Sequence, residues 1–222
     1  MKISKSTINI LKNFAGIKSS ILLEAGSVIK TKTLQNTLMV TATIEETLPL
    51  DFAVYDLNEF LNVIGLFQDP DLEFSDSYVK ITQDKNSIKY YAADRGLIEK
   101  DHPTKQVNFP EPDISFDLTA DILSQIKKIS STINAPDLSF IGVDGVLKFV
   151  VSDKKNPTSN AFEYIIGETD KTFNIDYKVD MMKLLNLNYT IYISAKRISK
   201  FVSSDNSVVY YVGVEMSSTF PQ

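Results

Sequence analysis

The chain has 222 residues, 43% of them hydrophobic, which suits one large domain or two of about 110 residues with real cores. It has no cysteine, which excludes disulfides, thiolate zinc sites, iron–sulfur clusters and a cysteine nucleophile. The net charge of −5 argues against a simple, uniformly basic nucleic-acid binder. Without a signal peptide or an apolar run of roughly 18–20 residues, we expect an intracellular protein that does not bind membranes.

Two basic amphipathic helices are predicted at corresponding places in the two halves of the chain, over residues 4–15 and 119–131. When these segments are aligned, Leu11 lies over Ile126 and Lys12 over Lys127. One apolar stripe of the first helix follows the i, i+3, i+4, i+7 spacing of a buried face and consists of Thr7, Ile10, Leu11 and Phe14.

A second pair of helices is predicted over residues 54–61 and 178–185. Their alignment places Asp56 over Asp180 and Phe60 over Leu184. Asp56 is a suitable N-cap, because its carboxylate accepts hydrogen bonds from the first free N–H groups of a helix. We therefore expect two helices in each half.

Strands fill most of the remaining sequence. We expect them at residues 20–23, 27–31, 37–44, 48–55, 72–74, 78–82, 87–92, 114–118, 137–143, 146–152, 160–167, 172–179, 188–195, 197–203 and 207–216. Asp144-Gly145 lies between two of these and is a strong hairpin signal. The repeated order predicts two similar domains, residues 1–100 and 114–222, joined by a proline-rich connector at 101–113.

No catalytic site is predicted. Ser124 and Lys127 match S-x-x-K and Ser204-Asp-Asn206 matches S-D-N, but the K-T-G element of the same serine hydrolases is absent. His102 is the one histidine and is expected on the surface of the connector. There is no P-loop, G-x-G-x-x-G motif or complete EF-hand loop. We therefore predict a protein that is not an enzyme and needs no cofactor or metal.

The lysines of the predicted helices remain to be explained. Lys5, Lys12, Lys127 and Lys128 lie on polar faces, and Lys183 lies on the second helix of the second half. A solvated surface would explain one such helix, but repetition in an acidic chain favours contact with phosphates. No aromatic residues alternate with these lysines, so duplex DNA held without sequence specificity is the better fit.

Four segments resemble a known family, the sliding clamps of T-even-type bacteriophages, which are DNA polymerase processivity factors. They are the opening MKISKSTINILKNFA, the block LDFAVYDLNEFL that starts at Leu50, Ala92-Ala93-Asp94 and Asn108-Phe109-Pro110. The resemblance covers essentially the whole chain and is most specific in the second segment.

This resemblance implies an α+β protein with two similar domains of the DNA clamp fold. Each domain has two helices packed on antiparallel sheets, and three subunits form a ring around duplex DNA. Neighbouring subunits would join by pairing the edge strands near residues 87–92 and 160–166. The interface residues implied in this way are Ser87, Lys89, Tyr90, Tyr91, Phe162, Tyr164 and Ile165.

The resemblance also implies partners. They are the replicative DNA polymerase, an ATP-driven clamp loader and, as further candidates, late-transcription factors, all met in the cytoplasm of the infected host cell. A partner peptide would enter a pocket near Phe109, Pro110 and Tyr211. The alternative is a two-domain, β-rich structural or scaffold protein of a phage, which does not predict lysines on both first helices.

Overall fold

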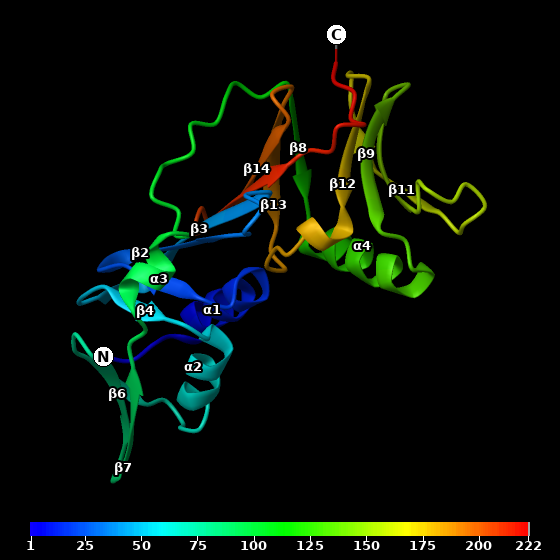
Figure 1. Ribbon diagram of the computed structural model, residues 1–222. Helices are drawn as coiled ribbons and strands as arrows, with labels where there is room; N and C mark the ends of the chain where they lie inside the picture. The colour runs from blue at the N-terminus through cyan, green and yellow to red at the C-terminus, as the bar shows by residue number, and fades with distance from the viewer. Residues whose placement is uncertain (222) are drawn as a thin grey trace. The chain divides into compact units, whose positions relative to one another are not determined.

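The computed structural model describes residues 1–221, which form two compact units, residues 1–106 and 107–221 (Figure 1). Each unit combines helices with antiparallel strands, so the predicted α+β class is confirmed. Each predicted strand range overlaps a strand of the structure.

The first unit begins with helix α1, Lys5–Ile17. Ser4 caps it, and its hydroxyl accepts a hydrogen bond from the Thr7 amide at 3.1 Å. The predicted stripe is buried. It faces a pair of strands, β2 (Gly26–Lys32) and β3 (Leu38–Leu48), which run antiparallel.

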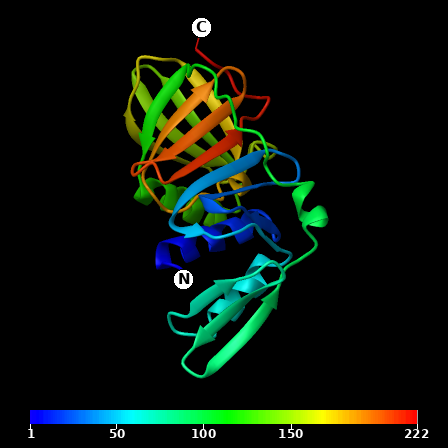
Figure 2. The same ribbon diagram turned by 90° about the vertical axis from the view of Figure 1, so that its left-hand side faces the viewer.

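Helix α2 covers the other part of the first unit. Strand β1 (Ile21–Leu23) pairs with β4 (Phe52–Val54), which leads into α2, Leu57–Ile64. The α2 helix lies against a three-stranded sheet, in the order β5-β6-β7 (Figure 2). The bounds of these strands and of the following short helix α3 are Asp71–Phe74, Tyr78–Gln83, Asn86–Tyr91 and Arg95–Glu99.

The second unit contains two antiparallel arrays of strands. The first has the order β11-β10-β9-β12, and the second has the order β15-β14-β13-β8. In chain order, β8 to β15 are Ile114–Leu118, Asp137–Val143, Val146–Ser152, Phe162–Glu168, Phe173–Lys178, Tyr189–Ser194, Ile198–Ser203 and Val208–Gly213. Helix α4, Ala120–Ile133, follows β8, and its buried Leu123 and Ile126 pack near β10.

Aromatic rings from both arrays meet in the core of the second unit. Phe116 of β8 lies 5.0 Å from Phe140 of β9, and Tyr177 of β12 lies 6.2 Å from Phe201 of β14, between ring centroids. Such tilted and edge-on pairs add to the stabilisation from burial. The two arrays therefore share one core.

The predicted hairpin at Asp144-Gly145 is confirmed. Val143 of β9 pairs with Val146 of β10, and the two residues between them have φ values of 51° and 81°. Positive φ at both central positions is the geometry that an Asp-Gly turn favours.

The helix predicted over residues 178–185 is wrong. The structure has only a single 3₁₀ turn there, η1, Val179–Met181. Its N-cap residue, Lys178, makes no side-chain capping bond. Side chains bond the backbone at Leu184 and Leu185, and these contacts replace the hydrogen bonds of a helix.

Candidate functional surfaces

The lysines of α1 lie on its solvent-facing side. Lys5 and Lys12 are exposed, opposite the buried stripe. The start of the helix is fixed by Glu46 of β3, whose carboxylate accepts bonds from the Ser4 amide and, at 2.5 Å, from the Thr7 hydroxyl. Burial alone would raise the pKa of Glu46, but these hydrogen bonds outweigh it and hold the pKa below its usual value.

The lysines of α4 differ from one another. Lys128 is exposed, whereas Lys127 is half-buried and donates a hydrogen bond from Nζ to the Leu184 carbonyl oxygen at 2.7 Å. Burial lowers the pKa of Lys127. Lys183 is exposed in the segment after η1. The sequence pattern alone did not distinguish Lys127 from its neighbour.

Strands β7 and β11 are edges of their arrays and carry exposed apolar side chains. On β7, Tyr91 is 67% exposed, and the Lys89 ammonium lies 4.2 Å from the centre of the Tyr78 ring. On β11, Ile165 is 61% exposed and Tyr164 is 44% exposed. Large apolar side chains beside unpaired backbone groups are typical of edges that pair with another chain.

The other predicted interface residues occupy the same two strands. Ser87 is exposed, and Phe162 lies partly over Phe149, with 6.1 Å between ring centroids. Tyr90 instead turns towards α2, where its hydroxyl donates to the Asp56 carbonyl oxygen at 3.2 Å. Burial, together with the nearby carboxylates of Glu59 and Asp56, raises the pKa of Tyr90 to about 12.

Two of the three residues predicted for a partner pocket lie together. The Phe109 and Tyr211 rings are 6.4 Å apart, and Pro110 next to Phe109 is half-buried. Burial raises the pKa of Tyr211. These side chains give the second unit a partly exposed apolar surface with one phenolic hydroxyl.

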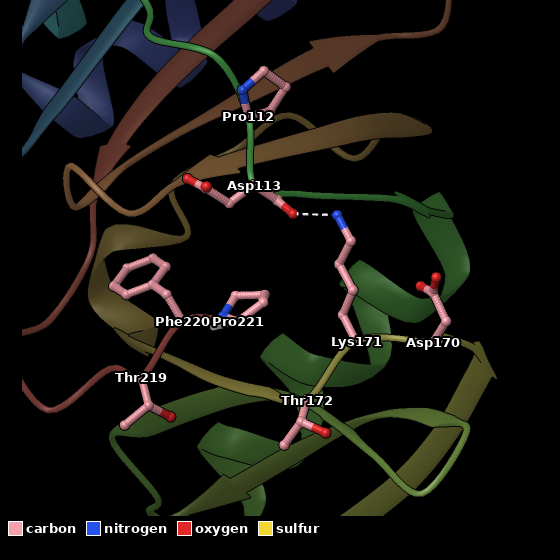
Figure 3. Close-up of a pocket in the computed structure, with 8 residues that line it drawn as sticks. All are labelled: Pro112, Asp113, Asp170, Lys171, Thr172, Thr219, Phe220 and Pro221. Carbon is pink, nitrogen blue, oxygen red and sulfur yellow. Dashed lines mark hydrogen bonds between the residues drawn. The ribbon is translucent and has the colours of Figure 1, made fainter.

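A hollow of about 840 Å³ lies elsewhere on the second unit (Figure 3). The Lys171 ammonium borders it and donates to the Asp113 carbonyl oxygen at 2.5 Å, opposite Phe220 and Pro221. No local sequence pattern predicts this hollow, because its walls come from three distant segments: Pro112, Asp113, Asp170, Lys171, Thr172, Thr219, Phe220 and Pro221.

The C-terminal segment beside this hollow is held against β12 by Asp176. This carboxylate is buried, pairs with the Lys154 ammonium, and accepts bonds from the hydroxyls of Ser217 at 2.6 Å and Ser139 at 2.9 Å. Burial alone would raise the pKa of Asp176, but these donors outweigh it and keep the pKa below its usual value.

The expectation that His102 lies on the surface is wrong. Its side chain is 3% exposed, and Nε2 lies 3.1 Å from a carboxylate oxygen of Glu24. The cause is helix α3, which was not expected from the sequence. This helix packs on β1 and β4 through Ile98 and brings the residues that follow it against the unit.

Within residues 1–221, no helix is both long and apolar enough to cross a membrane. No group of three or more acidic or histidine side chains in the same range is arranged to hold a metal ion.

Comparison with known proteins decides the family. The model of the family described as DNA polymerase processivity factor matches residues 2–102. The sliding clamp of Vibrio phage KVP40 is 32% identical over 97% of this chain and 99% of its own length. The chain belongs to the sliding clamp family. The clamps of Escherichia phage RB69 and Enterobacteria phage T4 are 32% and 30% identical, each over 99% of both chains.

Solved structures confirm the clamp fold. The structure described as the C-terminal region of FEN-1 bound to A. fulgidus PCNA matches with a TM-score of 0.71 at 14% identity, over 99% of this chain and 100% of that one. A Helicobacter pylori beta clamp bound to a DNA ligase peptide matches with a TM-score of 0.62 at 17% identity, over 100% of this chain and 68% of that one. This sliding clamp is therefore a processivity factor and not an enzyme, and the alternative of a structural or scaffold protein is set aside.

Proposed function

We propose that this sliding clamp closes as a ring of three copies around duplex DNA and tethers the replicative DNA polymerase. The proposed DNA-facing residues are Lys5, Lys12, Lys128 and Lys183. Lys127 belongs to the same proposed surface and lies on α4 next to Lys128. A few lysines in an acidic protein attract the phosphate backbone without reading bases, which suits a protein that must slide. Tethering would raise the local concentration of polymerase at the primer end.

The ring would close by head-to-tail pairing of β7 in one copy with β11 in the next. The observation that carries this proposal is that β7 and β11, which both lie at the edge of their arrays, bear large exposed apolar side chains. The two strands also carry opposite charges: Lys89 lies on β7, and Glu163 and Glu168 lie on β11, where Glu163 also pairs with Lys148 of β10. Head-to-tail contacts form a closed ring when the rotation closes.

Partner peptides are proposed to bind at the apolar surface of Phe109, Pro110 and Tyr211. The replicative polymerase, an ATP-driven clamp loader and late-transcription factors are the candidate partners, in the cytoplasm of an infected cell. An aromatic pair beside a proline suits a short apolar anchor of a partner peptide.

The proposal also includes the domain organisation. Residues 1–100 and 114–222 are the two clamp domains, and residues 101–113 connect them.

Retention on DNA tests the ring. The clamp would be loaded on nicked circular duplex, which would then be cut once with a restriction enzyme. We expect release to accelerate strongly after the cut, because a topologically linked ring slides off a free end. Equal retention on circular and linear DNA would show that the protein holds DNA by affinity alone.

A further inference from the structure

The segment after η1 is held by side chains and not by a helix. In residues 182–187 the Met182 amide donates to the Val179 carbonyl oxygen at 2.8 Å, and the Leu187 amide donates to the Leu185 carbonyl oxygen at 2.9 Å. Other polar groups of this backbone therefore need different partners, because a buried backbone group without one is costly.

Three side chains supply such partners. The Tyr210 hydroxyl accepts from the Leu185 amide at 3.1 Å, and the Tyr189 hydroxyl donates to the Leu185 carbonyl oxygen at 2.9 Å. The third is Lys127, whose bond to the Leu184 carbonyl oxygen is the one that comes from α4. A bond from a charged donor is stronger than a neutral one, so this contact fastens the segment to the helix.

The burial of residues 182–184 shows which side chain depends on the hydrogen bond from Lys127. Met182 and Leu184 are each 2% exposed, whereas Lys183 between them is exposed. When both apolar side chains are seated in the core, the Lys183 side chain starts on the opposite, outer side of the backbone. If Leu184 lost its buried position, the Lys183 side chain would therefore no longer be held in one direction.

We propose that Lys127 is a positioning residue, which anchors residues 182–187 to α4 and thereby sets Lys183 for contact with the DNA backbone, without contacting phosphate itself. This inference rests on the proposed function, since it takes the surface of Lys128 and Lys183 as DNA-facing. Lys127 and Lys128, which the sequence pattern does not distinguish, therefore have different roles. Lys128 acts directly, and Lys127 acts through the carbonyl group of Leu184.

Hydrogen exchange of the free protein tests the anchor without DNA. In Lys127→Met the stem is kept and the donor is lost, so amides of residues 182–187 should exchange about tenfold faster. The matched control Lys128→Met loses the same charge from an exposed neighbour and should exchange as the wild type does. Lys127→Arg keeps a charged donor and should restore protection. Equal exchange in Lys127→Met and Lys128→Met would overturn the anchor.

Salt dependence of binding to a short duplex tests the positioning role. The slope of log K against log salt is negative, and each lost lysine–phosphate contact makes it less steep by about one. Lys128→Met with Lys183→Met should make it less steep by about two. Lys127→Met alone should make it less steep by about one, and adding Lys183→Met should cause no further change, because both changes remove the contact of Lys183.

The possible results differ in what they reject. Additive losses for Lys127→Met and Lys183→Met would mean that Lys127 contacts phosphate directly, which overturns the positioning role. No change of slope in any variant would reject the DNA-facing surface and the positioning role with it. In that case faster exchange in Lys127→Met would still show that the anchor exists, so the two failures are distinguishable.

Discussion

Corresponding segments of the two units reach different structures. The α2 helix runs over Leu57–Ile64, while the aligned segment in the second unit forms the turn Val179–Met181 followed by non-helical backbone. Asp56 caps α2 by accepting from the amides of Asn58 and Glu59 at 2.9 and 3.1 Å. Its aligned partner, Asp180, lies within the turn and not at its cap.

The difference lies in the surroundings of each segment. In the second unit, Lys178 occupies the cap position, and its ammonium pairs with Asp137. Lys127, Tyr189 and Tyr210 then bond the backbone that follows. Similar apolar spacing therefore leads to a helix in one unit and an anchored turn in the other, because caps and side-chain partners outside the segment decide which hydrogen bonds form.

The largest expected effect concerns the edges that the two units expose. Successive N–H groups point to opposite sides of a strand, so of Tyr164→Pro and Ile165→Pro one should remove a donor from the open side of β11. We expect that variant to keep its circular dichroism spectrum and to lose the trimer. Native mass spectrometry checks this. If Tyr164→Pro and Ile165→Pro both fold and both remain trimeric, β11 is not the interface.

The side-chain anchoring of the second unit should be sensitive to Asp176. Asp176→Ala leaves Lys154 and two hydroxyls without their acceptor, and we expect unfolding to require about 3 kcal/mol less free energy. The exposed Asp170→Ala is the control and should stay within about 0.5 kcal/mol of the wild type. Denaturant unfolding at neutral pH measures both.

The same carboxylate predicts a pH dependence. The pKa of Asp176 is lower in the folded protein than its usual value of about 3.9, so its contribution to stability is present above about pH 4. It is lost as the pH falls through the folded pKa. The wild type should therefore lose stability over this acid range more steeply than Asp176→Asn, and parallel curves for the two proteins would contradict the assignment.

The exposed lysines of the first helices offer a comparison across both units. Lys12→Glu with Lys128→Glu should reduce polymerase processivity about tenfold at moderate salt, because two attractive phosphate contacts become repulsive. Lys100→Glu with Lys196→Glu makes the same charge change at exposed positions outside α1 and α4 and should have little effect. Primer-extension lengths on a single-primed template measure this. Equal processivity of the two double variants would reject α1 and α4 as the DNA-facing helices.

The smallest expected effects compare the two aligned aspartates directly. Asp56→Ala removes the cap of α2 and should lower the free energy of unfolding by about 1 kcal/mol. Asp180 is not the cap of its turn, so Asp180→Ala should change this free energy by less than about 0.5 kcal/mol. Similar losses for both variants would mean that the two segments are held in the same way.

Local signals made most of the fold predictable. Ser4, the stripe of α1 and the Asp144-Gly145 turn each specify structure through neighbours in sequence. The failures depend on distant partners. His102 is buried because α3 folds back on β1 and β4, and Lys127 turns inward because its ammonium group donates a hydrogen bond to the Leu184 carbonyl oxygen, far away in sequence.

The native mass in solution tests the central claim most directly. Light scattering over a concentration series should give a species of about 75 kDa, three times the subunit mass of 24.9 kDa, as closure by β7 and β11 predicts. A species that remains at 24.9 kDa at the highest concentration would contradict ring closure by these edges.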